Sequence, residues 1–291
     1  MGIRLNGVEL AKKFKAEIKD TIAKEKNMGK RTPSLASIII GEDGGSLSYI
    51  KNQVKISEEL GINYEVLRFP KSISEDEIIE NIEELNKSSN VDGIILQLPL
   101  PGDFNEGRII ESISYKKDVD SLTDINIGKF YKGEESFIPC TARSVLQLIK
   151  STCDDLRGKK AVVVGRSNIV GKPTSYLLLN EHCTVTICHS NTKELKDICK
   201  SADILVTALG IPNFITVDYV KKEAIVIDVG TTLVDGKIRG DVDFDSVIEV
   251  ASYVSPVPGG VGAMTTTMLM KNTCEAWLKN VCEDTYSNSS K

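Results

Sequence analysis

Hydrophobic side chains alternate along the chain between the spacing of helices and that of strands. Residues 8–26 carry an apolar side chain about every fourth residue, which predicts a helix with one buried face. Residues 34–40 form a β-branched run, which predicts a buried strand. The segment Ser74-x-x-Glu77 is a capping box and predicts that a helix over 74–85 begins there. The other elements predicted in this first series are a loop at 41–45, a helix at 46–60 that Gly61 ends, and strands at 64–69 and 93–98.

A second series of alternating elements follows residue 140. A strand at 160–165 leads into a helix that begins near Gly171. Further elements are predicted as strands at 184–189, 204–209 and 224–229, an amphipathic helix at 264–279 and a frayed polar tail at 283–291. Alternation of this kind predicts parallel sheets with right-handed crossovers. The fold class is therefore α/β, with two α/β domains and a boundary near Pro139-Cys140-Thr141.

Composition narrows the kind of protein. The chain has 291 residues, a net charge of −5 and no run of Lys or Arg, which argues against a nucleic-acid-binding groove. Its seven cysteines are scattered without a C-x-x-C pair, which predicts reduced thiols, no metal site and a cytoplasmic location. No run of roughly 18 apolar residues and no signal peptide are present, so no membrane association is expected.

A glycine-bounded loop follows the predicted strand at 160–165. The segment Gly165-Arg166-Ser167-Asn168-Ile169-Val170-Gly171 joins that strand to a helix. A glycine turn lets the backbone approach a pyrophosphate, and the helix N-terminus offers free N–H groups. The spacing of the glycines departs from G-x-G-x-x-G, so a plain turn between strand and helix is the alternative. With a nucleotide bound, Gly165, Arg166, Ser167, Val170 and Gly171 would contact it.

The end of the next predicted strand bears on which nucleotide is bound. NAD sites usually place an acidic residue there, where it binds the ribose 2′-hydroxyl. Here the strand ends Cys188-His189-Ser190, without an acid. An acid would repel a 2′-phosphate, whereas Arg166 and Ser190 could donate to one, and His189 would contact the cofactor beside them. The pattern therefore favours NADP over NAD. A surface strand end without a role is the alternative for His189.

Three further segments, together with the glycine loop, resemble one family. They are residues 92–101 (DGIILQLPLP), the run Lys117-Asp118-Val119-Asp120 followed by Pro139-Cys140-Thr141, and residues 256–265 (PVPGGVGAMT). These motifs closely resemble those of the bifunctional methylenetetrahydrofolate dehydrogenase/cyclohydrolase family (FolD type), in the same order and over nearly the whole chain. The resemblance implies a homodimer of two-domain protomers that bind folate in a cleft. It further implies a folate-binding catalytic domain at 1–140 plus 266–291 and a Rossmann-like NAD(P)-binding domain at 141–265.

The resemblance also assigns site residues. By position it places Tyr49, Gln53, Gln97 and Asp120 in the catalytic site. Tyr49 offers a flat aromatic face to the folate rings, and Asp120 can accept hydrogen bonds from the amino-pyrimidine edge. Plain packing or capping roles are the alternatives for these side chains. The residues implied to contact the folate are Tyr49, Gln97, Pro99, Asp120, Pro258, Gly259, Gly260 and Val261.

One family residue is missing. The family has a Lys four residues after the Tyr, and here that position is Gln53. Lys51 and Lys55 lie roughly 200° and 240° around the helix from Tyr49 and are no substitutes. Hydride transfer from the folate methylene group needs positioning, whereas hydrolysis of the methenyl product needs proton transfer, which an amide cannot provide. The sequence thus predicts a dehydrogenase with weak or absent cyclohydrolase activity. A fully bifunctional enzyme and a catalytically silent folate- or nucleotide-binding regulator are the alternatives.

Smaller departures from the family pattern concern loop residues. Ser121 stands where the family usually has Gly, and Ala142 and Ala263 stand where it usually has Pro. These changes remove no reactive group. We expect them to alter loop stiffness and folate affinity.

Overall fold

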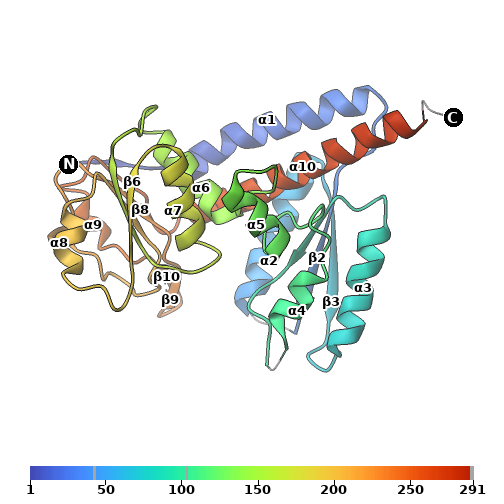
Figure 1. The fold of residues 1–291 in the computed structure, drawn as a ribbon, viewed down its shortest axis with the longest axis horizontal. Helices are drawn as coiled ribbons and strands as arrows, with labels where there is room; N and C mark the ends of the chain where they lie inside the picture. The colour runs from blue at the N-terminus through green and yellow to red at the C-terminus, as the bar shows by residue number, and fades with distance from the viewer. Residues whose placement is uncertain (42–43, 103, 289–291) are drawn as a thin grey trace. The chain divides into compact units, whose positions relative to one another are not determined.

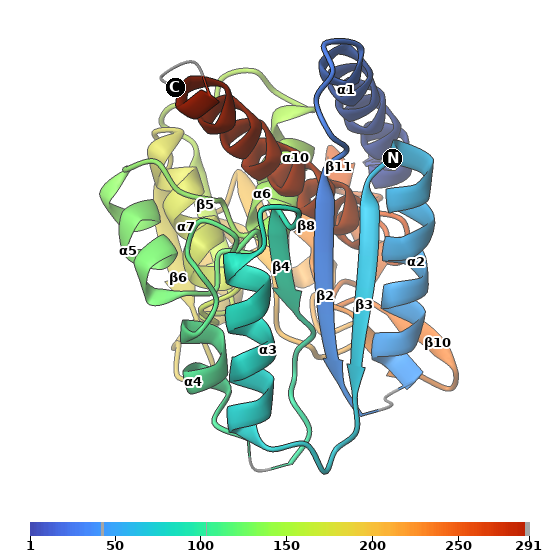
Figure 2. The ribbon, with the colours of Figure 1, turned by 90° about the vertical axis from the view of Figure 1, so that its right-hand side faces the viewer.

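The chain divides into two compact units (Figures 1 and 2). The computed structural model describes residues 1–41, 44–102 and 104–288, without the side chains of 44–48 and 283–288. The six-stranded unit comprises Met1–Lys13 and Pro139–Met268, and the three-stranded unit comprises Phe14–Ile138 and Leu269–Lys291. Helices α1 (Gly7–Asn27) and α10 (Val261–Asn288) each run from one unit into the other.

The six-stranded unit is built on one parallel sheet. Its strand order is β1-β11-β8-β7-β5-β6. The strands are β1 (Ile3–Arg4), β5 (Lys160–Val164), β6 (Thr184–Cys188), β7 (Ile204–Thr207), β8 (Ile225–Asp228) and β11 (Tyr253–Val254). The helical segments are α6 (Cys140–Lys150), α7 (Gly171–Asn180), α8 (Leu195–Lys200), η1 (Val217–Tyr219) and α9 (Phe244–Val247). The four strands predicted in this half are confirmed, as is the Rossmann-like arrangement. The antiparallel hairpin of β9 (Thr232–Val234) and β10 (Lys237–Arg239) was not predicted.

The N-terminus departs from the predicted domain boundaries. Residues 1–13 were predicted to belong with the first domain, but they group with the six-stranded unit. The cause is pairing at the edge of the sheet, where Ile3 and Arg4 of β1 lie in register with Tyr253 and Val254 of β11. A two-residue strand carries too little hydrophobic pattern to be recognised from sequence.

The three-stranded unit contains a smaller parallel sheet with the order β3-β2-β4. Its strands are β2 (Ser34–Ile40), β3 (Asn63–Phe69) and β4 (Gly93–Leu96), and its helices are α2 (Gly44–Leu60), α3 (Glu75–Lys87), α4 (Glu106–Glu111) and α5 (Asp124–Lys132). Helices α3 and α4 pack on one face of the sheet through a core that includes Ile38, Ile82 and Ile109 (Figure 2). Hydrogen bonds from α2 reach side chains on the opposite face.

Two helix termini test the sequence predictions. The capping box before α3 is confirmed, because Glu77 N donates to Ser74 Oγ at 3.2 Å and Ser74 N donates to Glu77 Oε2 at 2.9 Å. The C-terminal helix is longer than predicted. It runs from Val261 to Asn288 and so includes most of the tail predicted to be frayed. Of the predicted loop at 41–45, residues 42–43 lie outside the described residues and Gly44 already begins α2.

Within the part of the chain that the structure describes, we find no helix with the length and apolar character needed to cross a membrane.

Candidate active site

The loop after β5 requires glycine at both of its ends. Gly165 has φ +136°, and a Cβ atom there would lie 2.5 Å from the carbonyl oxygen of Ala208. A Cβ atom on Gly171 would lie 2.1 Å from the carbonyl oxygen of Gly165. Contacts under 3.0 Å do not occur for real Cβ atoms. Gly165 is required because the chain after β7 approaches the loop at Ala208, and Gly171 because the first turn of α7 packs directly against the loop.

This loop lies where doubly wound sheets bind their ligands. In the sheet, β5 lies between β6 and β7, so the chain order reverses at β5 and β7. Nucleotides bind at the carboxyl ends of strands at such a reversal. The loop and the start of α7 therefore form a candidate phosphate-binding cradle, and a side chain at either terminal glycine would clash with the neighbouring backbone.

Side chains of the loop complete this cradle. The Ser167 hydroxyl accepts from the backbone N–H groups of Val170 at 3.2 Å and Gly171 at 3.3 Å, which fixes the first turn of α7. Arg166 is exposed beside it. Beyond β6, Ser190 is exposed and His189 is half-buried. His189 Nδ1 accepts from the backbone N–H of Asn191 at 3.2 Å, so the histidine has a local role in its turn.

The predicted folate-contacting segment at 258–261 also lies in the six-stranded unit. Gly259 has φ +105°, and its carbonyl oxygen accepts from Gly7 N at 2.9 Å. A Cβ atom on Gly7 would lie 2.1 Å from the carbonyl oxygen of Gly260. Pro258 is exposed, whereas the Val261 side chain is 3% exposed and belongs to the core. Any ligand contact of Val261 would therefore involve its backbone.

Two buried carboxyl groups support the loops that follow β7 and β8. Asp228 accepts from the backbone N–H groups of Gly230, Asp241 and Val242, each at 2.9 Å. Asp241 accepts from Leu209 N at 2.6 Å and Ile211 N at 2.9 Å. Burial raises the pKa of Asp228 to about 6, although the backbone donors act in the opposite direction. This pair was not predicted from the sequence.

Two of the predicted catalytic residues of the three-stranded unit, Tyr49 and Gln53, lie on α2. Tyr49 is 37% exposed, while Gln53, one helical turn later, is fully buried. Lys51 and Lys55 are both exposed. The prediction that neither lysine replaces the missing family residue is therefore consistent with the helix geometry.

Gln53 belongs to a buried hydrogen-bonded ring of four side chains. Gln97 Nε2 donates to Gln53 Oε1 at 3.1 Å and to Ser37 Oγ at 3.0 Å. The Tyr64 hydroxyl donates to Gln53 Oε1, and Ser37 is hydrogen-bonded to Tyr64. The structure thus brings two predicted residues, Gln53 and Gln97, into contact and adds Ser37 and Tyr64, which the sequence analysis missed.

A signal for Ser37 exists in the sequence, but none was found for Tyr64. Ser37 is a polar residue in the middle of an otherwise hydrophobic strand, and a buried hydroxyl needs a partner. Burial raises the pKa of Tyr64 to about 12, so its hydroxyl is protonated at neutral pH and donates.

The segment carrying Asp120 is held from several directions. Asp118 is buried and accepts from Thr123 N at 2.9 Å and from Asn126 Nδ2 at 2.9 Å. Asn272 of α10 donates to the carbonyl oxygen of Val119 at 2.7 Å. Asp120 itself is half-buried. Beyond β4, Pro99 is exposed two residues after Gln97.

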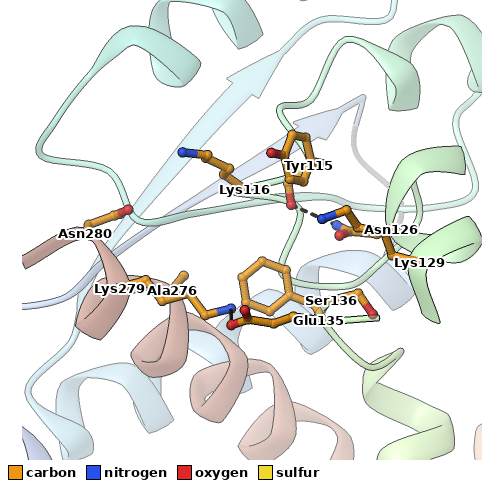
Figure 3. A pocket seen from close by; sticks show the side chains of 10 residues that line it. Tyr115, Lys116, Asn126, Lys129, Glu135, Ser136, Ala276, Lys279 and Asn280 are labelled. Carbon is orange, nitrogen blue, oxygen red and sulfur yellow. Dashed lines mark hydrogen bonds and ion pairs between the residues drawn. The ribbon is translucent and has the colours of Figure 1, made fainter. Parts of the chain in front are cut away.

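A cavity of about 190 Å³ lies behind this segment, between the chain before Asp118, α5 and α10 (Figure 3). Asn126 Nδ2 donates to the carbonyl oxygen of Tyr115 at 2.9 Å on one side, and Lys279 pairs with Glu135 at 2.7 Å on the other. None of the predicted catalytic side chains lines this cavity. Its residues tether the loop of Asp120.

A doubly wound sheet with a glycine-bounded loop at its point of reversal, linked to a second α/β unit with a buried polar ring, defines a two-domain dinucleotide-binding enzyme. The chain belongs to the tetrahydrofolate dehydrogenase/cyclohydrolase family. Residues 5–120 match the family's catalytic domain, and residues 139–281 match its NAD(P)-binding domain.

Relatives and solved structures agree with this assignment. The chain is 59% identical over 276 residues to the bifunctional protein FolD of Clostridium acetobutylicum, covering 95% of this chain and 99% of the relative. The crystal structure of bifunctional FolD from Campylobacter jejuni superposes with a TM-score of 0.93 at 41% identity, over 96% of this chain and 99% of the other. A Trypanosoma brucei relative, described as complexed with NADP and an inhibitor, gives a TM-score of 0.92 at 33% identity, over 96% and 98% of the two chains.

Proposed function

We propose that this enzyme oxidises 5,10-methylenetetrahydrofolate to 5,10-methenyltetrahydrofolate with NADP, and that it hydrolyses the product weakly or not at all. In the oxidation, the methylene carbon loses a hydrogen with its electron pair, and the nicotinamide ring accepts that hydride. The neutral folate becomes the methenyl cation as NADP⁺ becomes NADPH. Lone pairs on the flanking folate nitrogens drive the departure of the hydride, so the protein's task is to position the two rings.

Different residues would position the nucleotide and the folate. The loop from Gly165 to Gly171 would hold the pyrophosphate through backbone N–H groups. Arg166 and Ser190 would donate to a 2′-phosphate, because no acid follows β6 to repel it. Tyr49, exposed on α2, would stack on the folate, and Asp120 would accept from its amino-pyrimidine edge. These roles support NADP rather than NAD.

Hydrolysis makes a different demand. Water must add to the methenyl carbon and lose a proton, which needs a general base of suitable pKa. Position 53 is a fully buried glutamine, and its amide neither gains nor loses a proton near neutral pH. The titratable member of the ring, Tyr64, has its pKa raised to about 12 by burial and is no base at pH 7. The buried amide at position 53 is the observation that carries the proposal.

Two assays test it on the purified full-length chain. Formation of NADPH from methylenetetrahydrofolate and NADP, compared with NAD, measures the dehydrogenase. Loss of the methenyl chromophore in the same buffer measures the hydrolase, after subtraction of the spontaneous rate. We expect oxidation to exceed enzymatic hydrolysis by about 10²-fold or more, the contribution of a missing general base. Enzymatic hydrolysis at a rate comparable with oxidation would disprove the proposal.

A fully bifunctional enzyme is the second candidate. The relatives at 52–59% identity that carry the name bifunctional protein FolD favour it. In that case another group, or a water molecule held by Gln53 and Gln97, would support hydrolysis. A silent folate- or nucleotide-binding regulator would show neither reaction. A homodimer stays a prediction from the resemblance, and a cytoplasmic location stays a prediction from the cysteine pattern.

A further inference from the structure

We propose that Tyr64 is a positioning residue that orients the Gln53 amide so that its Nε2 atom donates a hydrogen bond to the bound folate. This inference rests on the proposed function, since it assigns the folate as the acceptor. Tyr64 contributes no reacting atom and acts only through Gln53.

The closed ring fixes which way the Gln53 amide points. Gln53 Oε1 accepts from two donors, the Tyr64 hydroxyl and Gln97 Nε2. Both N–H groups of Gln97 Nε2 are used, because the second one reaches Ser37 Oγ at 3.0 Å. With its oxygen bound twice, the Gln53 amide must present its Nε2 atom on the remaining side. The orientation therefore depends on two donors together, and loss of the Tyr64 hydroxyl would leave the amide oxygen held by Gln97 Nε2 alone.

The Nε2 atom of Gln53 has no hydrogen-bond acceptor among the described residues, although the Gln53 side chain is fully buried. An amide N–H group that is buried without an acceptor is costly, and native structures rarely tolerate one. An unpaired donor of this kind points to a ligand. Tyr49 stands one helical turn before Gln53, and a reduced folate offers carbonyl oxygens and ring nitrogens as acceptors. The folate therefore supplies the acceptor that the protein lacks.

Kinetics of single and double variants test the link between the two residues. Tyr64→Phe keeps the aromatic side chain but removes one of the two donors to Gln53 Oε1, so the Gln53 amide is held less firmly. We expect the KM for methylenetetrahydrofolate to rise about tenfold while kcat and the KM for NADP stay within twofold, the effect of one hydrogen bond lost from ground-state binding. In a Gln53→Met background, Tyr64→Phe should cause no further rise, because residues that act through each other are not additive. Tyr219→Phe, which removes a tyrosine hydroxyl from the six-stranded unit, is the matched control.

Nuclear magnetic resonance provides a readout that does not depend on turnover. The chain contains only three glutamines, Gln53, Gln97 and Gln147, so ¹⁵N-glutamine labelling gives three side-chain amide groups. Tetrahydrofolate, which lacks the one-carbon bridge and cannot react, is the probe. Its addition should shift the Gln53 Nε2 signals and leave those of Gln147, on α6, in place. In Tyr64→Phe, the Gln53 signals of the free protein should broaden or exchange faster with solvent.

Each outcome bears on one claim. An unchanged folate KM in Tyr64→Phe, or an effect that adds to that of Gln53→Met, would overturn the positioning role. Gln53 signals that tetrahydrofolate does not shift would remove the folate as acceptor. If the wild-type protein oxidises no methylenetetrahydrofolate, the proposed function fails, while the signals of the free protein still report whether Tyr64 orients Gln53.

Discussion

The two units build their sites from different material. In the six-stranded unit, the predicted nucleotide site is a backbone shape: two glycines, a capped helix start and the reversal point of a parallel sheet. In the three-stranded unit, the candidate site is a set of side chains, the predicted ones on α2 and after β4 and two unpredicted ones on β2 and β3. The backbone site of the six-stranded unit has no room for a Cβ atom at its two glycines. The side-chain site can keep its shape while one side chain changes its chemistry.

This difference explains how position 53 can change its chemistry while the surrounding fold is kept. Replacing a lysine ammonium by an amide in a buried site leaves polar groups that need new partners. Tyr64 and Gln97 each donate a hydrogen bond to the amide oxygen, so the oxygen of the buried glutamine is fully paired. A change of one side chain could thus remove a reaction step without removing the fold, as we propose for position 53. In a site formed by the backbone, a side-chain substitution cannot remove one chemical group and leave the shape unchanged.

The largest expected effect comes from restoring the family residue. In Gln53→Lys, burial will lower the pKa of the lysine toward neutral and make it a usable general base. We expect enzymatic hydrolysis of methenyltetrahydrofolate to rise by roughly 10²–10⁴-fold, while oxidation changes by less than about tenfold. Gln53→Met, which has similar length and no base, is the control. Hydrolysis by the lysine variant no faster than by the methionine variant would show that one side chain does not decide the reaction.

An added methyl group tests the backbone site. Gly171→Ala places a Cβ atom 2.1 Å from the carbonyl oxygen of Gly165, so the loop must move by about an ångström. We expect the KM for NADP to rise by roughly 10²-fold, the usual consequence of such a displacement. Gly128→Ala in α5, where a Cβ atom meets nothing within 4 Å, is the control. Tetrahydrofolate affinity, measured by calorimetry, should be unchanged in both. A normal KM for NADP in Gly171→Ala would contradict a role of this loop in binding the nucleotide.

The same difference determines how far the sequence could be interpreted. Glycine positions and hydrophobic periods are local, so the strands β2 to β8 and the loop between β5 and α7 were predicted correctly, whereas β1 and β11 were not. The partners of Gln53 were not, because Ser37 and Tyr64 reach it only once β2 and β3 pair. The short strand β1 and its pairing were missed for the same reason, since its partner β11 lies about 250 residues away. The Asp228–Asp241 pair likewise joins loops that are distant in sequence.

Asp228 is a position where the six-stranded unit does depend on a side chain. Its folded-state pKa of about 6 lies above the ordinary value of 3.8, chiefly because of burial. Protonation therefore favours the folded state. The contribution of this carboxyl to stability grows as pH falls through 6, and above pH 6 the buried charge is a cost.

The expected size follows from that shift. Between pH 7 and pH 5, the free energy of unfolding of the wild type should rise by about 1 kcal/mol relative to Asp228→Asn, which does not titrate. Urea unfolding of both proteins at pH 5, 6 and 7 measures the difference. A difference that stays constant over this range would mean that Asp228 has an ordinary pKa in the folded protein.

Ser121 is the converse case, a position where the three-stranded unit depends on its backbone. Ser121 follows Asp120, has φ +60° and is 2% exposed. Its Oγ atom has no hydrogen-bond partner among the described residues. A non-glycine residue in the left-handed region destabilises the folded state by roughly 1–2 kcal/mol. Replacing it by glycine removes this strain, but the more flexible unfolded chain offsets part of the gain. We expect Ser121→Gly to stabilise the protein by about 1 kcal/mol and to raise its Tm by roughly 2–4 °C.

Ser121→Ala separates the two contributions at this position, because it removes the buried hydroxyl and leaves the backbone strain. If glycine stabilises and alanine does not, the strain dominates, and the loop of Asp120 obeys the same backbone rule as the loop at Gly165. If alanine stabilises as much as glycine, the unpaired hydroxyl is the cause. In that case a folate bound beside Asp120 should pair the Ser121 hydroxyl and restore the stability that the unpaired hydroxyl costs. The gain in Tm on adding tetrahydrofolate should then be larger for the wild type than for Ser121→Ala. The thermal shifts of the three proteins with and without tetrahydrofolate therefore decide whether position 121 acts through its backbone or its side chain.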